Sequence, residues 1–161
     1  MKKYFYTDGV SKFGPYSIEE LLQKGISRDT KIWFFGLSTW TPINEVEELN
    51  TRLTIVGKLS NLALQLYGWY IKNGHVRDEA EIEAVKSFFH ANFPPEAHEF
   101  NGFYERLYLY QCQAWVGFIL QDFLSYYKNC QRWVDLFEKE PQMVKMEPQH
   151  FIKGMHNLMS A

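Results

Sequence analysis

The chain has 161 residues with a formal net charge of −2, five histidines and two cysteines. Six basic and seven acidic residues precede position 51, and eleven and twelve follow it, so neither part has the positive excess that marks a nucleic-acid-binding protein. The first eight residues lack the apolar run of a signal peptide, and the most apolar window, residues 114–127, is interrupted by Gln121 and Asp122 and is shorter than the roughly 20 residues of a spanning helix. We therefore expect a cytoplasmic protein with neither a nucleic acid nor a membrane as partner.

Residues 3–13 predict a β-hairpin. Lys3-Tyr4-Phe5-Tyr6-Thr7 alternates in the manner of a half-buried strand, and residues 10–13 offer a return strand. Between them, Asp8-Gly9 is a strong signal for a tight turn.

A short helix is predicted next. Ser17 and Glu20 have the spacing of a capping box, in which the Ser17 hydroxyl accepts a hydrogen bond from the backbone amide of Glu20. Gly25 is the kind of residue that ends a helix in the left-handed conformation. The expected apolar stripe consists of Ile18, Leu21 and Leu22.

The first fifty residues close with a third strand and an acidic turn. Residues 31–35 form an apolar run that Gly36 interrupts, and residues 40–43 lead into a turn at 45–49. The predicted order is strand, strand, helix, strand and turn, in a small domain spanning residues 1–50.

The motifs in this segment, together with its order of elements, resemble the bacterial variant of the GYF domain over about residues 3–50. They are Gly14-Pro15-Tyr16, Ser17-Ile18-Glu19-Glu20-Leu21, Thr30-Lys31-Ile32-Trp33 and Gly36-x-x-x-Trp40-x-Pro42. The resemblance implies a non-enzymatic adaptor that holds proline-rich peptides against a bowl of aromatic rings. Such docking loses little conformational entropy, because a polyproline helix is already extended.

The same resemblance implies a set of peptide-binding residues: Tyr4, Tyr6, Tyr16, Trp33 and Trp40. The sequence departs from the eukaryotic family where Gly25-Ile26-Ser27 stands in place of Gly-Tyr-Phe. A second interpretation is that Trp33, Trp40, Phe5 and Phe13 fill the core of a small domain. Since Tyr4 and Tyr6 are two residues apart in a strand, they share a face, which is either the bowl or the core.

From Leu53 the apolar period changes to about 3.6, which predicts an all-α region over residues 53–161 with about five helices. The first ends at Asn73-Gly74, and Asp78 followed by Glu81 predicts the N-cap of the second. A turn is expected within residues 117–122, and Pro148 is expected to open the last helix. The stripes expected to be buried are Ile82, Val85, Phe88 and Phe89; Phe103, Leu107, Tyr110, Ala114, Gly117 and Phe118; Phe123, Tyr127, Cys130, Val134 and Phe137; and Phe151, Ile152, Met155 and Leu158.

Tyr126-Tyr127-Lys128 and the segment 133–137 before a proline are weakly similar to tetratricopeptide-type helical hairpins. The expected fold class is therefore α+β, with a small β-β-α-β domain followed by a helical-hairpin bundle. The aromatic residues of the helices either line a groove for a peptide or partner helix or form the core.

Catalytic chemistry has little support in the residues. His90, Glu96, His98 and Glu99 are candidate metal ligands, but carboxylate-bridged metal bundles need the Glu-x-x-His pattern on two helices, and the sequence has it once, at Glu147–His150 and away from these residues. No nucleotide-binding or serine-nucleophile motif occurs either, and Cys112 and Cys130 are expected to be reduced and buried. We expect no cofactor.

The leading hypothesis is a non-enzymatic adaptor whose GYF-like module docks on an extended or proline-containing segment of a protein or peptide partner, with a helical scaffold behind it. In the alternative, the module is a structural packing element and the helical bundle acts as a homo-oligomer or complex subunit. A metal-dependent enzyme is a distant third.

Overall fold

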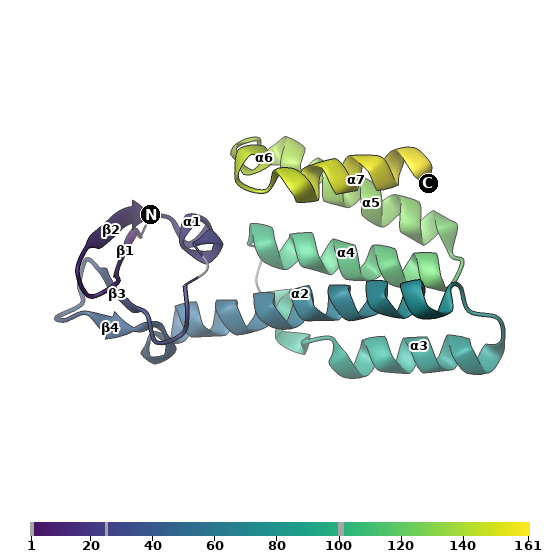
Figure 1. The fold of residues 1–161 in the computed structure, drawn as a ribbon, viewed down its shortest axis with the longest axis horizontal. Helices are drawn as coiled ribbons and strands as arrows, with labels where there is room; N and C mark the ends of the chain where they lie inside the picture. Colours follow the sequence, from purple (N-terminus) through teal and green to yellow (C-terminus); the bar gives the residue numbers. More distant parts are fainter. Residues whose placement is uncertain (1, 25, 100–101) are drawn as a thin grey trace. The chain divides into compact units, whose positions relative to one another are not determined.

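The computed structural model describes residues 2–24, 26–99 and 102–161. The chain divides into two compact units, Met1–Thr54 and Ile55–Ala161. The first contains a small antiparallel sheet and the second is helical (Figure 1), which confirms the α+β class.

The sheet of the first unit consists of β1 (Tyr4–Thr7), β2 (Lys12–Tyr16), β3 (Lys31–Phe34) and the two-residue β4 (Thr41–Pro42). Its strand order is β2-β1-β3-β4, and every neighbouring pair is antiparallel. The predicted hairpin joins β1 to β2. Its turn is held by the Asp8 carboxylate, which accepts the backbone N–H of Val10 at 2.8 Å and of Ser11 at 2.7 Å.

Helix α1 (Ile18–Gln23) begins where the capping pattern predicts, because the Ser17 hydroxyl accepts the Glu20 backbone N–H at 3.2 Å. Gly25, expected to end this helix, lies outside the described residues. The predicted acidic turn is instead the 3-10 helix η1 (Ile43–Glu45) and the start of α2 (Glu47–Asn73). The core of the unit is a cluster of Tyr4, Leu21, Ile32, Ile43 and Leu49.

The second unit contains the rest of α2 and then α3 (Glu79–Asn92), η2 (Pro95–Glu99), α4 (Phe103–Ile119), α5 (Phe123–Lys139), α6 (Gln142–Met146) and α7 (Pro148–Ser160). The short α6 was not predicted. Helix α2 ends at Asn73 as expected, with Gly74 at a φ of +73°. The Asp78 carboxylate caps α3 by accepting the Glu81 backbone N–H at 2.9 Å, and Pro148 opens α7.

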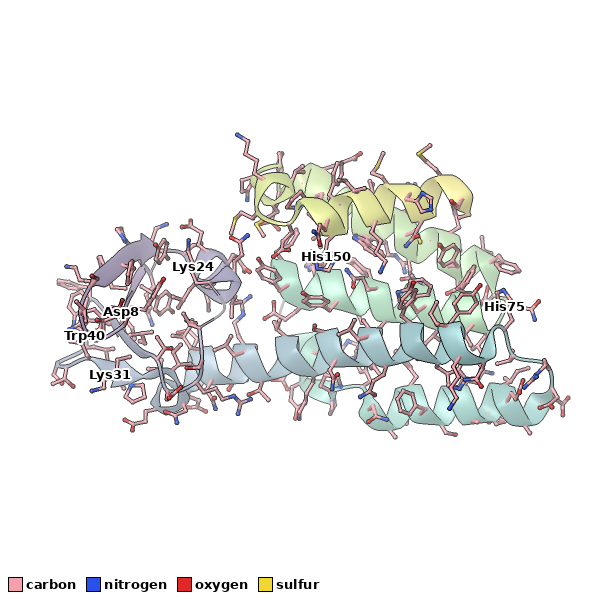
Figure 2. All side chains as sticks on the ribbon, in the orientation of Figure 1. Asp8, Lys24, Lys31, Trp40, His75 and His150 are labelled. Carbon is pink, nitrogen blue, oxygen red and sulfur yellow. The ribbon has the colours of Figure 1, made fainter. Side chains whose placement is uncertain are left out.

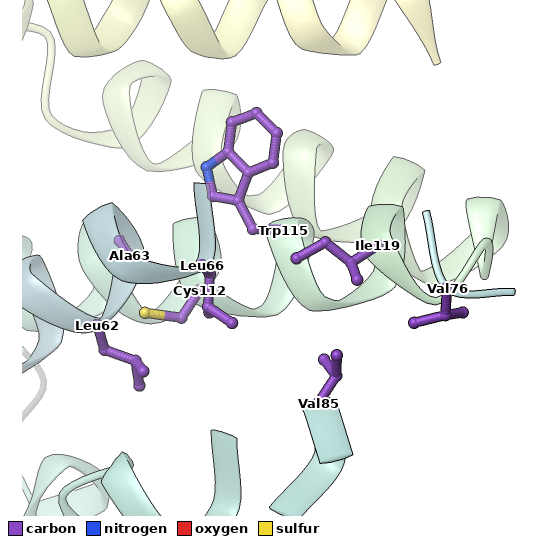
Figure 3. Packing of buried hydrophobic residues seen from close by; sticks show 8 residues of the cluster. All are labelled: Leu62, Ala63, Leu66, Val76, Val85, Cys112, Trp115 and Ile119. Atoms are coloured by element: carbon purple, nitrogen blue, oxygen red, sulfur yellow. The ribbon is translucent and has the colours of Figure 1, made fainter. Parts of the chain in front are cut away.

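Two glycines allow close helix contacts in this unit. A Cβ at Gly117 would lie 3.0 Å from the backbone N of Tyr126, so this glycine lets α4 approach α5. A Cβ at Gly154 would lie 2.9 Å from the indole Nε1 of Trp133, a fully buried side chain. Figure 3 shows a further buried cluster, which joins Leu62, Ala63 and Leu66 of α2 and Val85 of α3 to Cys112, Trp115 and Ile119 of α4.

Most residues of the predicted stripes are buried or half-buried, among them Val85, Leu107 and Val134, but five are exposed, and for these the prediction was wrong. They are Phe88, Phe123, Tyr127, Ile152 and Met155, of which Ile152 is 64% exposed. On α5, Cys130, Val134 and Phe137 are buried as predicted, and the buried face also contains Tyr126, Trp133 and Leu136, which were not predicted. On α7, Gly154 is buried because it receives the indole of Trp133, and this contact turns Ile152 outward.

Both cysteines are buried and reduced, as expected. Burial raises the pKa of the Cys112 thiol to about 12 and that of Cys130 to about 11. In the described parts of the chain, the helices are all too short or too polar to cross a lipid bilayer.

Candidate functional site

The sheet separates the aromatic residues of the first unit onto two faces. Tyr4 and Tyr6 alternate with Phe5 along β1, and in the neighbouring strand Tyr4 pairs with Phe34 while Phe5 pairs with Trp33. Tyr4, Tyr6 and Phe34 belong to the core side of the sheet. Phe5 and Trp33 contact each other on the other side, with ring centroids 5.9 Å apart.

Tyr4 lies in the core and not on a surface. Its side chain is 1% exposed, and its ring meets that of Phe34 edge to face at 5.6 Å. Burial, together with the nearby Glu48 carboxylate, raises the pKa of its hydroxyl to about 12. The face that Tyr4 and Tyr6 share was interpreted either as a binding surface or as part of the core. For Tyr4 the core interpretation is therefore correct, because its ring packs inside the domain against the sheet.

Tyr6 forms a row of rings with two residues of β2, which we call the ring ladder: Tyr6, Phe13 and Tyr16. The ring of Tyr6 stacks with that of Phe13 at 4.9 Å and with that of Tyr16 at 6.0 Å, with interplanar angles of 22° and 24°. All three side chains are half-buried. Tyr6 and Tyr16 also pack against the core cluster, which holds the ladder in place.

An irregularity in β2 creates the ring ladder. Phe13 and Tyr16 are three positions apart, so in a regular strand they would point to opposite faces of the sheet. The pairing of β1 with β2 shifts between Tyr4↔Tyr16 and Tyr6↔Phe13, so that β2 has one residue more than β1 over this interval. Such a bulge reverses the alternation and brings both rings to the face of Tyr6.

Gly14 is required at this bulge for two reasons. Its φ is +128°, a conformation that residues with a side chain rarely adopt. A Cβ there would also lie 2.7 Å from the carbonyl oxygen of Tyr4. The Gly-Pro pair is therefore the sequence signal that could have identified Phe13 as a neighbour of Tyr6 and Tyr16; the sequence alone suggested Phe13 only as a possible core residue.

A positive charge ends the ring ladder. The Lys24 ammonium, at the C-terminal end of α1, lies 4.6 Å from the ring centroid of Tyr16 (Figure 2). Lys24 itself is exposed to solvent. The ladder thus combines adjacent half-exposed rings with one cation.

The two predicted tryptophans lie away from the ring ladder. The Trp33 indole, beside Phe5 on the opposite face of the sheet, donates a hydrogen bond to the backbone oxygen of Leu37 at 2.9 Å. Trp40 precedes β4 and is 36% exposed. Of the five predicted site residues, the structure brings together Tyr6 and Tyr16 on one surface, adds Phe13, and separates them from Trp33.

A polar cavity of about 350 Å³ lies beside the hairpin turn, lined by Thr7, Asp8, Gly9, Ser27, Asp29, Thr30 and Lys31. Its carboxylates are already engaged. Backbone hydrogen bonds from Ser11 and Val10 lower the pKa of Asp8, and the hydroxyl of Ser27 lowers that of Asp29. These contacts stabilise the turns on both sides of the cavity.

The candidate metal ligands do not form a metal site. His90 and His98 line a cavity of about 560 Å³ together with Phe89, Ala91, Phe93, Pro95 and Gln113, and this lining contains no carboxylate. Over residues 2–24, 26–99 and 102–161, no three His, Cys, Asp or Glu side chains come together in a group that could hold a metal ion.

Comparison with known families supports the interpretation of the first unit. Residues 4–49 match the family model described as GYF domain 2. The match supports a GYF-like domain in this segment, and GYF domains are in general protein-interaction modules. Comparison with curated proteins and with solved structures gave no match.

Proposed function

We propose that this chain is a non-enzymatic adaptor whose GYF-like domain binds an extended, proline-containing segment of a protein partner. The observation that carries the proposal is the ring ladder of Tyr6, Phe13 and Tyr16, three half-buried rings in contact on one face of the sheet. The family match at residues 4–49 supports an interaction module in the same segment.

The physical properties of the ladder suit a proline-rich ligand. Tyrosine and phenylalanine offer large rigid contact surfaces, and a polyproline helix loses little entropy on binding because it is already extended. Tyr6 and Tyr16 of the ladder pack against the core cluster, and the bulge at Gly14 sets the direction of its rings, so they are already positioned for binding. Preorganisation of this kind lowers the entropic cost of association.

In this proposal the remaining predicted residues have different roles. Tyr4 supports the ladder through the core. Trp33 and Trp40 lie outside it, and we propose that Trp40, which is partly exposed, contacts flanking residues of a longer partner segment. The helices of the second unit serve as a scaffold with a docking surface of their own.

The test is an NMR titration of the whole chain with a synthetic oligoproline peptide. Two variants provide a matched comparison: Phe13→Ala in the ladder and Phe5→Ala on the opposite face, both of which shorten a half-buried phenylalanine of the sheet. We expect saturable shifts at Tyr6 and Tyr16, an affinity at least about 10-fold weaker for Phe13→Ala, and little change for Phe5→Ala.

Two outcomes would overturn this proposal. If the folded chain shows no shifts up to millimolar peptide, the ladder is not a binding surface for proline-rich segments. If Phe5→Ala weakens binding as much as Phe13→Ala does, the ligand uses the opposite face or the loss reflects destabilisation of the sheet. Circular dichroism of both variants measures that destabilisation directly.

A further inference from the structure

A second surface with the features of a binding site lies wholly within the helical unit. A cavity of about 250 Å³, which we call the α2–α4–α7 cavity, is bounded by three helices. Helix α4 contributes Trp115, whose indole points away from Val85 in Figure 3. The lining residues are Ser60, Ala63, Leu64, Tyr67, Tyr108, Gln111, Trp115, His150 and Lys153.

One wall of this cavity continues as an exposed apolar ridge on α2. Leu64, Tyr67 and Ile71 follow one another at i, i+3 and i+7, so they lie on the same side of the helix. They are 67%, 37% and 64% exposed. The ridge is about 10 Å long, which matches two turns of a helix lying alongside it.

The opposite wall, on α7, is basic. The Lys153 ammonium lies 4.8 Å from the ring centroid of Tyr67 and 5.6 Å from that of Trp115. The cavity lining includes no carboxylate. The sequences of residues 55–73 and 148–160, which include the α2 and α7 residues of the lining, contain neither Asp nor Glu.

A carboxylate also lies near this wall. Glu147, just before α7, is engaged by the Tyr104 hydroxyl, which donates to it at 2.9 Å, and lies 4.0 Å from His150. The cation that the wall offers to a ligand is therefore that of Lys153.

We infer that the α2–α4–α7 cavity and the adjoining ridge bind an amphipathic helix of a protein partner that carries acidic residues beside its apolar face. The apolar side chains of that helix pack along Leu64, Tyr67 and Ile71, in the helix-in-groove mode. Its carboxylates lie toward Lys153. This inference does not depend on the function proposed for the first unit.

The charge of the surface disfavours a second copy of the chain as the occupant. A two-fold dimer presents the same patch on both subunits, so it would place Lys153 of one copy against the same basic patch of the other. Like charges brought together at an interface oppose association. An acidic partner gains from the same arrangement.

The experiment uses the whole chain and two designed helical peptides, both capped at their ends. They share leucines at i, i+3, i+4 and i+7, and differ only in having glutamate or lysine at the flanking positions. Binding is followed by calorimetry and by the NMR signal of the Trp115 indole. We expect the glutamate peptide to bind at least about 10-fold more tightly than the lysine peptide, with a difference that shrinks at high salt.

Matched variants locate the site. Leu64→Glu and Ile152→Glu change residues of similar exposure, 67% and 64%, but Ile152 does not line the cavity. Lys153→Glu and Lys128→Glu make the same charge change inside and outside the cavity. We expect Leu64→Glu and Lys153→Glu each to weaken binding of the glutamate peptide at least about 10-fold, and the two controls to change it by less than about 2-fold.

Three outcomes would overturn the inference. The glutamate peptide fails to bind up to millimolar concentration, both peptides bind equally, or the controls weaken binding as much as the cavity variants do. A dimer seen by sedimentation that Leu64→Glu dissociates would assign this surface to a second copy instead.

Discussion

Replacing Gly154 by alanine should destabilise the helical unit, although alanine is the better helix former. Gly154 lies inside α7, where Gly→Ala alone would stabilise by about 0.5–1 kcal/mol. The added Cβ would lie 2.9 Å from Trp133 Nε1 and 3.1 Å from two ring carbons, distances that require a shift. The neighbour that must move is a rigid and fully buried ring.

Two costs oppose the gain in helix propensity. Overpacking of a well-packed core costs about 1–3 kcal/mol. Trp133 Nε1 donates a hydrogen bond to the backbone oxygen of His150 at 3.1 Å. Displacement of the indole would weaken this hydrogen bond, whose net contribution to the free energy of unfolding is about 1 kcal/mol. We therefore expect Gly154→Ala to lower the free energy of unfolding by about 1–3 kcal/mol.

The matched control is Gly68→Ala in α2, where an added Cβ meets nothing within 4 Å. This variant should be more stable than the native chain by about 0.5–1 kcal/mol. Urea unfolding followed by helical circular dichroism measures both variants. If Gly154→Ala is stabilised as much as Gly68→Ala, the packing of α7 on Trp133 described here is incorrect.

Three other predictions follow from single side chains. Asp78→Ala removes the N-cap of α3 and should lower stability in the same urea assay by about 1 kcal/mol; a loss below a few tenths would contradict the capping role. Burial raises the pKa of the Cys112 thiol to about 12, so alkylation of this thiol by iodoacetamide at pH 8 should be slow in the native state and fast in urea. Rapid labelling of Cys112 in the native state would show that the thiol is accessible. Burial raises the pKa of Tyr4 to about 12 in the folded chain, above the value of about 10 in the unfolded chain. The stabilising contribution of its neutral hydroxyl is therefore complete below about pH 10 and is lost as the pH rises towards 12. Comparing the tyrosinate absorbance of the native chain with that of Tyr4→Phe tests this, and titration of Tyr4 near its ordinary pKa of about 10 in the folded chain would refute it.

Features that depend on a few neighbouring residues could be predicted from the sequence. The caps at Ser17 and Asp78, the turn at Asp8 and the opening of α7 by Pro148 are all found where the patterns place them. Each involves hydrogen bonds or steric limits within a few residues of the chain, so no distant partner is needed to set it.

Which aromatic side chains of a helix are buried could not be predicted in the same way. Helix α5 carries bulky apolar residues on more than one side, among them Phe123, Tyr127 and Trp133. Which side of α5 is buried depends on the helix that packs against it. Here α7 has no side chain at Gly154, so the Trp133 ring packs there and is buried, while Phe123 stays 51% exposed. The spacing of apolar residues along one helix does not show which helix packs against it.

The ring ladder could be predicted from the sequence only in part. Tyr6 and Tyr16 were predicted as site residues from the family resemblance, but their contact with Phe13 depends on the pairing of β1 with β2. Strand alternation alone separates Phe13 from Tyr16, and only the register shift at Gly14 unites them. The sequence contains the glycine but does not show the pairing.

The bulge in β2 also means that the aromatic content of this segment is a poor guide to its surface. Without the bulge every ring of the sequence would stay in place, but regular pairing over the three positions from Phe13 to Tyr16 would turn one of the two rings to the far side of the sheet. Related modules that keep this spacing of aromatic residues but have a side chain in place of Gly14 should therefore have the same aromatic content and differ in ligand preference. Among such sequences, the glycine at the bulge is the feature to compare first.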